Sequence, residues 1–371
     1  MTAAWPMVSL GEICEIQRGG SPRPISSYIT ESEDGINWIK IGDVAVGAKY
    51  LSSTEEKIKP EGAKRSRMVY PGDFILSNSM SFGRPYIMRT SGCIHDGWLV
   101  LRDTKKRLSE DYLYHVLGSD FVVSQFKKMA VGAVVKNLNK EVVQAVVIPL
   151  PPLPEQRRIA AILDQADALR AKRREALAQL DSLTQSIFIE MFGDISVGPK
   201  FNLGSIRAFA DANSGKSAKS VLSDEKTGIP IYGGNGINGW AHTALYDHPV
   251  LIFGRVGQQC GNAFITEGPS WVTDNAIVVR ISDVTKLNPL FVLHAFQGSS
   301  FSNRVKHLDL PFINQGMILD NPIPIPPLIV QQTFANRIQT LEALKVCHRT
   351  SFTELDALFA SLQHRAFRGE L

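Results

Sequence analysis

Residues 234–239, GNGING, have the spacing of the GxGxxG motif, with which a strand and a helix bind the pyrophosphate of a dinucleotide. This chemistry needs an amphipathic helix directly after the last glycine, and residues 240–244 do not predict one. We therefore interpret the motif as a flexible loop between strands.

Two further segments have part of a known chemical motif. Residues 214–217, SGKS, end as a Walker A phosphate loop ends, but the first glycine of that loop would stand at position 210, which is Ala210. Residues 320–323, DNPI, resemble the (D/N)PP(Y/F) loop that holds a flipped adenine in amino-methyltransferases, but lack its second proline and its aromatic residue. We interpret them as the approach to a helix.

Metal and nucleophile chemistry has little support in the sequence. The eight histidines are scattered, without the spacing of metal ligands. The four cysteines lie far apart without a CxxC pair, which argues against a disulfide framework and a zinc site and favours a reducing compartment. Because no Ser-His-Asp or paired-carboxylate group can be singled out, the sequence predicts no catalytic residues, no metal and no cofactor.

Length and charge limit the kind of protein. A chain of 371 residues with 44% hydrophobic and 20% charged residues predicts two domains. Neither a signal peptide nor a membrane span is predicted, so we expect a cytoplasmic protein with no membrane partner. Residues 1–150 hold 19 basic against 16 acidic residues, and residues 194–325 hold 10 against 10. If the protein binds DNA, specific polar contacts must therefore supply what bulk charge does not.

Two long helices must position whatever these segments do. Residues 148–153, IPLPPL, recur 175 positions later as IPIPPL, and each copy leads into a long run without Pro or Gly. Within each run, apolar residues fill eight of ten positions spaced alternately by three and four, from 159 to 190 and from 334 to 366. This is the spacing of a coiled-coil seam. We predict helices over residues 155–192 and 330–367 that pack antiparallel, stripe to stripe.

The segments before each helix predict globular domains. Residues 1–147 contain short apolar runs broken by Gly, Pro, Ser and Asp, with one helix over residues 110–129. The second half repeats this plan, with a helix near residues 289–305. Residues 114–121, YHVLGSDF, recur as HAFQGSSF at 294–301. The predicted fold class is α/β (mixed α+β), with curled mixed sheets in two globules that form a pseudo-two-fold repeat.

The expected order along the chain is globule, helix, globule, helix. We place the first recognition domain in residues 1–150 and the first proline segment and helix in 151–193. The second recognition domain follows in 194–325, and the second proline segment and helix in 326–371.

Several segments carry a resemblance to a known family. They are IPLPPLPEQRRIAAIL and its copy, LGEICEIQRGGSPRP, WIKIGDV, YPGDFILSNS and VGAVVKNLNKEVVQAVVIPLPP. With them, essentially the whole chain resembles the specificity subunit of a type I restriction-modification enzyme, in which two target recognition domains alternate with two conserved helical regions. The second copy departs from the pattern, because Ile329 and Val330 replace Pro154 and Glu155.

The resemblance implies a non-catalytic subunit that binds double-stranded DNA. Each globule would recognise one half of a split DNA sequence, and the helices would dock two methyltransferase subunits. Those partners would carry S-adenosylmethionine and flip the target adenine, and restriction (motor and nuclease) subunits could join them. Two alternatives stay open, namely the recognition module of a stand-alone methyltransferase or nuclease, and a coiled-coil scaffold whose heads bind proteins.

Loops between strands that are rich in Arg, Lys, Asn, Gln and Ser can contact both phosphates and base edges. Any one of these residues could equally be a solvated surface side chain. The candidates in the first globule are Arg18, Arg23, Lys40, Lys64, Arg65, Arg67, Ser79, Arg84 and Lys136. Those in the second are Lys216, Lys219, Asn235, Asn238, Arg255, Gln258, Gln259 and Arg304.

Overall fold

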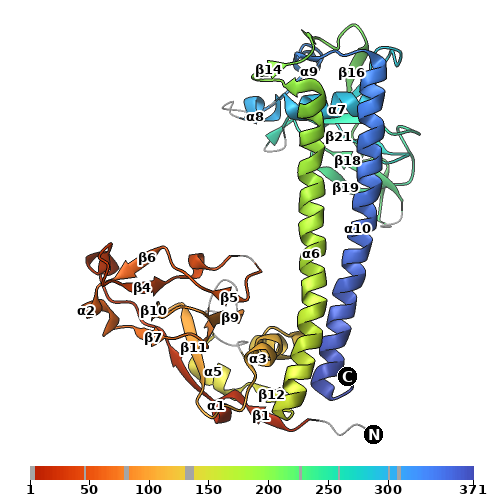
Figure 1. Ribbon diagram of the computed structural model, residues 1–371. Coiled ribbons are helices and arrows are strands. Elements are labelled where there is room, and N and C mark those ends of the chain that lie inside the picture. Colours follow the sequence, from red (N-terminus) through yellow and green to blue (C-terminus); the bar gives the residue numbers. More distant parts are fainter. Residues whose placement is uncertain are drawn as a thin grey trace. The chain divides into compact units, whose positions relative to one another are not determined.

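The computed structural model describes residues 5–45, 47–78, 83–129, 138–224, 228–257, 260–299, 301–306 and 311–371. The chain divides into two compact units, which we call the first and the second unit. The first holds residues 1–173 and 351–371, and the second holds residues 174–350. Each contains part of two long helices, α6 (Leu153–Phe192) and α10 (Leu328–Arg368) (Figure 1).

The first unit is built on two mixed five-stranded sheets, with strand orders β3-β6-β4-β10-β7 and β2-β11-β8-β9-β5, and on the pair β1-β12. Strand β10 runs parallel to β4, and β5 runs parallel to β9. The strands are β1 (Met7–Ser9), β2 (Cys14–Arg18), β3 (Ile29–Thr30), β4 (Ile36–Ile39), β5 (Tyr50–Leu51), β6 (Glu56–Ile58), β7 (Arg67–Val69), β8 (Phe74–Ser77), β9 (Pro85–Met88), β10 (Gly92–Ile94), β11 (Trp98–Asp103) and β12 (Val147–Pro149). The helices are α1 (Leu10–Ile13), α2 (Pro60–Ala63), α3 (Glu110–Leu117), α4 (Asp120–Met129) and α5 (Lys140–Ala145), with 3-10 turns η1 (Ile25–Ser27) and η2 (Ile41–Asp43).

Strand β8 is buried on both faces, which explains its unbroken apolar run. Phe74 and Leu76 point into a core shared with α3, α4 and the two long helices, whereas Ile75 points into a second core with Tyr86 and Trp98. The sheet that contains β8 therefore has apolar packing on each side, with helices on one face and the other sheet's residues on the opposite face.

The second unit repeats this arrangement with four-stranded sheets, in the orders β16-β23-β20-β21 and β17-β19-β18-β22, and two-stranded pairs β13-β14 and β15-β24. Its strands are β13 (Gly193–Asp194), β14 (Gly198–Pro199), β15 (Leu203–Gly204), β16 (Ala210–Ser214), β17 (Leu222–Ser223), β18 (Ile229–Gly233), β19 (Gly236–Ala241), β20 (Leu251–Gly254), β21 (Ala263–Ile265), β22 (Trp271–Val272), β23 (Ala276–Ile281) and β24 (Ile323–Pro324). Its shorter helices are α7 (Pro289–Gly298), α8 (Phe301–Lys306) and α9 (Gln315–Leu319). The mixed α/β class and the curled mixed sheets predicted from the sequence are confirmed.

The predicted helix over residues 110–129 is wrong in one respect, because it is two helices. Helix α3 ends at Leu117, where the Gly118 N–H still bonds to the Tyr114 carbonyl, and α4 begins at Asp120. The Ser119 hydroxyl donates to the Val116 carbonyl at 2.6 Å and so satisfies the end of α3. The predicted helix near residues 289–305 is likewise divided, into α7 and α8.

The long helices begin two residues earlier than predicted, at Leu153 and Leu328. Pro154 lies in the first turn of α6, where its missing N–H would have had no partner within the helix. Helix α10 has no acidic residue in its first turn, as the sequence indicated. No described helix is long and apolar enough to cross a membrane.

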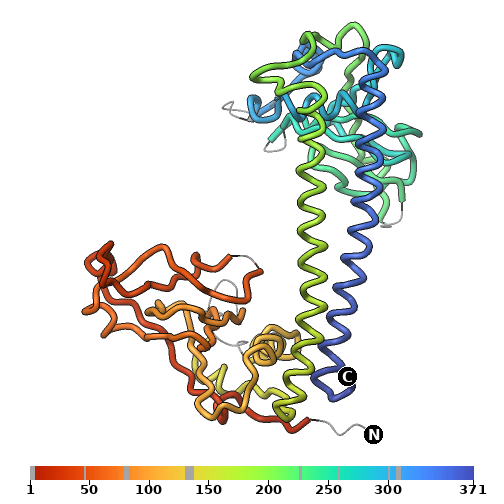
Figure 2. The backbone as a smooth tube through the Cα atoms, viewed as in Figure 1, coloured from red at the N-terminus to blue at the C-terminus, as the bar shows by residue number. Residues whose placement is uncertain are grey.

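In each unit the parts of α6 and α10 run antiparallel and are joined by polar contacts. In the first unit Arg170 donates from Nε to the Asp356 carboxylate at 2.6 Å, and its guanidinium lies 4.4 Å from the centroid of the Phe359 ring. Figure 2 shows the end of α10 beside the start of α6. There the Leu371 carbonyl oxygen accepts a hydrogen bond from the Arg158 guanidinium at 2.9 Å. In the second unit the buried Lys345 contacts Asp181 of α6 at 3.1 Å.

A buried glutamine ties the start of each long helix to its own unit. Gln156 Oε1 accepts from the Ser109 N–H at 2.8 Å, and its Nε2 donates to the carbonyls of Arg107 and Pro151. Gln331 makes the same three bonds in the second unit, with the Asn288 N–H and with the carbonyls of Lys286 and Pro326.

Replacing Gln156 by Ala should lower the free energy of unfolding of the first unit by about 2 to 4 kcal/mol, because one N–H and two carbonyls lose their partner in a buried place. Gln331→Ala should have a similar effect on the second unit. Urea denaturation measures both. The control is Gln179→Ala, on an exposed part of α6, with an expected change below about 0.5 kcal/mol. A loss below about 1 kcal/mol for Gln156→Ala would contradict the role of this side chain.

Candidate nucleic-acid interface

The two units have the same tight turn at the junction of their sheets. In the first unit it is His95, Asp96 and Gly97, between β10 and β11. In the second unit it is residues 273–275, between β22 and β23. The Asn78 N–H donates to the Gly97 carbonyl at 2.9 Å, and the Arg255 N–H donates to the Asn275 carbonyl at the same distance.

At each turn a glycine from another part of the chain packs closely against the backbone of the turn. The Gly19 N–H bonds to the Trp98 carbonyl, and the Gly215 N–H bonds to the Ala276 carbonyl. A Cβ atom on Gly19 would stand 2.1 Å from the His95 carbonyl oxygen, and one on Gly215 would stand 2.3 Å from that of Thr273. Only glycine fits at these positions. The glycine of the SGKS segment is therefore explained by a close approach of two backbones.

Two of the candidates in the first unit contact Asp96, and a third lines the hollow beside it. The Arg18 Nε donates to the Asp96 carbonyl at 3.1 Å, and the exposed Arg23 guanidinium lies 3.6 Å from the Asp96 carboxylate. A hydrogen bond from the Ser21 hydroxyl lowers the pKa of Asp96, so this acceptor is ionised at neutral pH. Lys40 lines the hollow beside it and is paired with Glu56 at 2.7 Å; that hydrogen bond raises the pKa of Lys40.

The hollow has a volume of about 760 Å³. The side chains of Pro22, Pro24, Ile25 and Trp38 give it an apolar wall, and Ser21, Arg23, Lys40, His95 and Asp96 give it polar groups. Burial lowers the pKa of His95, whose ring is tilted against Trp38 and Trp98 at centroid distances of 6.3 and 6.2 Å. A neutral imidazole there leaves the positive charge of this surface to Arg18, Arg23 and Lys40.

The remaining described candidates of the first unit lie around the same sheet junction. Arg65 follows α2 and lies 5.9 Å from the centroid of the Tyr28 ring, and Lys64 next to it is exposed. Arg67 is exposed on β7, opposite Ile94 of β10. Arg84 is half-buried before β9, with its guanidinium 5.7 Å from the centroid of the Tyr86 ring.

In the second unit, Lys216 and Lys219 are exposed after β16. The prediction of a flexible loop at residues 234–239 is wrong, because β18 and β19 form a hairpin there, and Gly236 adopts a φ of +97°. Asn235 lies in its turn and Asn238 on β19. A Cβ on Gly234 would stand 3.1 Å from the Gly254 Cα, so this turn packs beside the exposed Arg255.

Four candidates lie within regular elements rather than in loops, namely Arg18, Arg67, Asn238 and Arg304. Arg304, on α8, donates to Asn321 Oδ1 at 2.6 Å, and Asn321 Nδ2 donates to the Ser299 hydroxyl. The DNPI segment thus follows α9, is hydrogen-bonded to α8 through Asn321, and leads into β24. Four other candidates, Ser79, Lys136, Gln258 and Gln259, lie outside the described residues.

Sequence reasoning missed the turn itself. Its signal was present, since IHDGW at 94–98 and VTDNA at 272–276 each place an Asp and a turn residue between two apolar runs. Asp96 and the backbone of Asn78 organise the first turn, and neither residue was a candidate. Among the described residues, no group of three or more His, Cys, Asp and Glu side chains could hold a metal ion.

Comparisons with known proteins agree with one another. Residues 3–179 and 200–350 match the family described as type I restriction modification DNA specificity domain. The specificity subunit of the type I restriction enzyme EcoprrI from Escherichia coli is 22% identical over 296 residues, covering 73% of this chain and 72% of that protein. The MjaIX specificity subunit from Methanocaldococcus jannaschii is 22% identical over 407 aligned positions, covering 99% of this chain and 93% of that protein.

A solved structure has the same fold over nearly the whole chain. It is described as the structural basis underlying complex assembly and conformational transition of the type I R-M system. It superposes with a TM-score of 0.64 at 20% identity, over 99% of this chain and 98% of that chain.

Proposed function

The chain belongs to the family of type I restriction-modification DNA specificity domains, and from this premise we propose that each of its two units recognises one half of a divided DNA target. It is a specificity subunit of such a system, and specificity subunits are not themselves catalytic. The observation that carries the proposal is the turn found in both units, with basic and amide side chains around it.

The side chains at the two turns are suited to base edges as well as to phosphates. Arg23 and Lys40 flank the hollow of the first unit, and Arg255 and Asn235 flank the turn of the second. Arginine and lysine bond to the O6 and N7 atoms of guanine, and asparagine bonds to the N6 and N7 atoms of adenine. Because the net charge of the chain is only +4, binding would depend on these contacts more than on bulk attraction.

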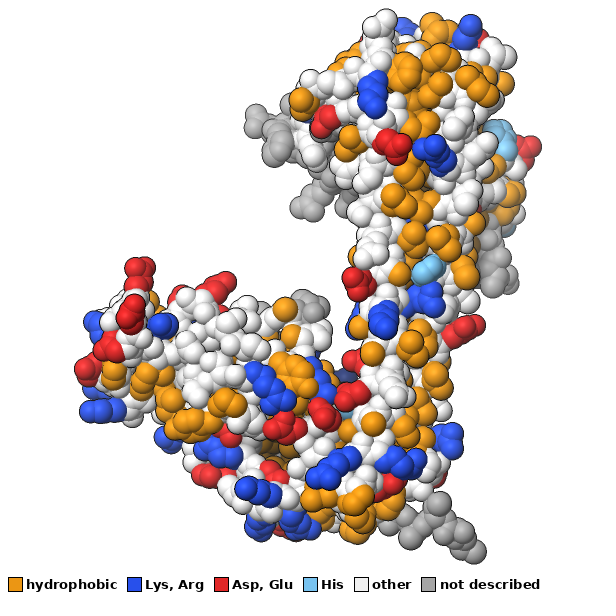
Figure 3. Space-filling view, viewed as in Figure 1, with side chains coloured by type: hydrophobic (Ala, Val, Ile, Leu, Met, Phe, Trp, Pro, Cys, Tyr) orange, Lys and Arg blue, Asp and Glu red, His pale blue; other side chains and the backbone are white. Residues whose placement is uncertain are grey.

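The long helices carry the surface that supports partner docking. Figure 3 shows hydrophobic side chains along α6 and α10. The large apolar residues exposed on them are Leu169, Leu183, Ile189, Ile329, Leu344, Val346 and Leu358. Exposed apolar surface of this kind is typical of protein interfaces. We infer that two methyltransferase subunits, which would carry S-adenosylmethionine, dock here, and that restriction subunits join them. The repeated helix supports two similar docking sites.

Replacing Arg84 or Arg255 by Ala should weaken binding to the cognate DNA by about 5- to 150-fold, because each loses a charged contact at the sheet junction. The measurement is a mobility shift of the complex with its methyltransferase subunits. The matched control is Arg280→Ala. This exposed arginine lies toward the far end of β23 from the turn, 3.7 Å from Asp211. Unchanged binding by both variants would show that the DNA contacts lie elsewhere.

The alternatives make different predictions in the same assay. A protein scaffold would shift no DNA, and a stand-alone methyltransferase would modify DNA without a partner. We expect specific binding together with dependence on the methyltransferase subunits for any methylation.

A further inference from the structure

A hollow lined by amide side chains lies beside the turn of the second unit. It has a volume of about 460 Å³ and is bounded by the β18–β19 turn, the start of β21, α7 and α8. Its lining includes Asn235, Asn262, Gln297 and Asn303, and no charged residue occurs among the described residues that line it. Asparagine and glutamine amides bond to base edges as well as to phosphates. The described lining has no Arg or Lys side chain, so it lacks the charge that supplies most of the affinity for phosphates.

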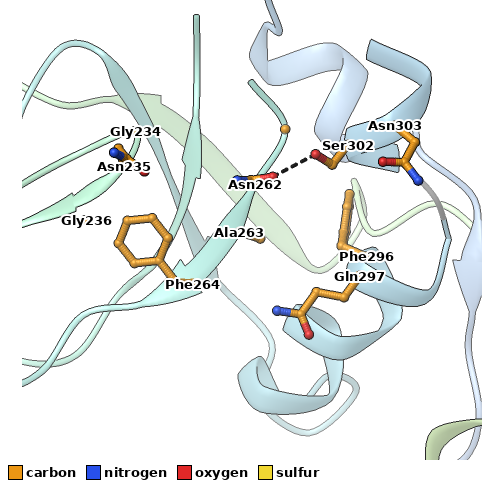
Figure 4. A pocket seen from close by; sticks show the side chains of 11 residues that line it. Gly234, Asn235, Gly236, Asn262, Ala263, Phe264, Phe296, Gln297, Ser302 and Asn303 are labelled. Atoms are coloured by element: carbon orange, nitrogen blue, oxygen red, sulfur yellow. Dashed lines mark hydrogen bonds between the residues drawn. The ribbon is translucent and has the colours of Figure 1, made fainter. Parts of the chain in front are cut away.

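Asn262 is the amide that the structure holds in place. Its Oδ1 accepts a hydrogen bond from the Ser302 hydroxyl at 2.7 Å, which fixes the plane of the amide between β21 and α8. Figure 4 shows these two side chains pointing toward one another, with Phe264 further along β21. An amide with a fixed orientation loses less conformational entropy when it binds a base.

The equivalent position in the first unit is Arg84. There the Gly83 N–H bonds to the Ser77 carbonyl, and the Ser77 N–H bonds to the Arg84 carbonyl. In the second unit the Gly261 N–H bonds to the Gly254 carbonyl, and the Gly254 N–H bonds to the Asn262 carbonyl. Gly83 and Gly261 share a positive φ, +75° and +77°. One backbone position thus carries an arginine in one unit and an asparagine in the other.

We propose that Asn262 contacts the major-groove edge of an adenine in the half-target of the second unit. The amide oxygen accepts from adenine N6–H, while the amide N–H donates to N7. Arginine at the equivalent position of the first unit suits guanine instead, so the difference between the units is a difference in base preference. The inference rests on the proposed function, because it names the base that this surface would recognise.

The test uses the full-length chain in complex with its methyltransferase subunits. Sequencing of methylated adenines first gives the target of the wild-type complex. Methylation rates are then measured on that DNA and on DNAs with each base pair of the second half replaced. Asn262→Asp keeps the shape and an acceptor for Ser302 but lacks the donor for N7, so it serves beside Asn262→Ala. The control is Asn336→Ala, at an exposed position on α10.

Both Asn262 variants should lose about 5- to 150-fold of discrimination at a single A·T pair of the second half. Discrimination in the first half, and all discrimination by Asn336→Ala, should stay unchanged. Unaltered discrimination by Asn262→Asp at every position, or a change confined to a G·C pair, overturns the assignment of Asn262 while DNA recognition stands. A wild-type complex with no sequence preference overturns the proposed function itself.

Discussion

Exchanging residues 1–147 for the corresponding domain of a relative should replace one half of the methylated sequence and leave the other half unchanged. The buried residues support this independence. The described cores of the first unit draw on residues 10–163 and 366–367, whereas those of the second draw on residues 188–338. A foreign first domain would therefore leave the packing of the second unit intact.

The donor domain must fit the helices that it will contact. Ile159, Leu163 and Phe367 from the long helices belong to the core of the first unit, and the Phe367 ring meets Tyr112 edge to face at 6.1 Å. A donor with an aromatic residue at the position of Tyr112 is the sound choice. Genome-wide mapping of methylated adenines is the measurement, and exchange of residues 203–321 is the reciprocal control. If both halves of the target change in one chimera, the units do not recognise DNA independently.

Inserting seven residues into each long helix should lengthen the gap between the two half-targets by about three base pairs, and methylation of the original sites should be lost. Seven helical residues add about 10 Å, and one turn of DNA, roughly ten base pairs, spans about 34 to 36 Å. Seven residues are also nearly two full turns, so the apolar stripe changes direction by only about 20°. Suitable positions are after Arg173 and after Thr350, where the chain passes from one unit to the other.

The control for this prediction is a variant with the seven-residue insertion in α6 alone. On α6 the seven residues separate Arg170 from Asp181, whereas their partners on α10, Asp356 and Lys345, keep their spacing. Antiparallel pairing therefore cannot be kept on both sides of the insertion. We expect that variant to methylate poorly at any spacing. The matched double insertion should recover methylation at the longer spacing. Should the double insertion keep the original gap, the helices would serve only as a docking surface and not as a spacer.

The two long helices were predictable because their signal is local. A narrow apolar stripe and a proline segment before it are properties of one continuous run, so α6 and α10 were located to within about two residues. The repeat of 175 positions was visible for the same reason, since Gln156 and Gln331 keep that distance. The breaks after Leu117 and Gly298 were missed because a helix end at a Gly–Ser pair depends on its capping hydrogen bonds.

The proposed DNA-binding surface could not be predicted from local sequence patterns. Arg18 and Asp96 lie 78 positions apart and meet only because β2 and β10 both end at the same sheet junction. The SGKS and GNGING segments suggested phosphate chemistry, yet their glycines serve a backbone crossing and a hairpin turn.

By itself, then, the sequence determined the repeated helices, the mixed α/β class and the family resemblance. Only the tertiary structure decided which side chains share a surface and that Arg84 and Asn262 occupy one equivalent position. Asn262 follows Arg84 by 178 positions, Gly215 follows Gly19 by 196, and the helices repeat at 175. Because the loops differ in length between the two units, no single shift of the sequence aligns all the equivalent positions. The equivalent positions are identified by their hydrogen bonds between strands, because the sheets fix the backbone whatever the length of the loops that join the strands.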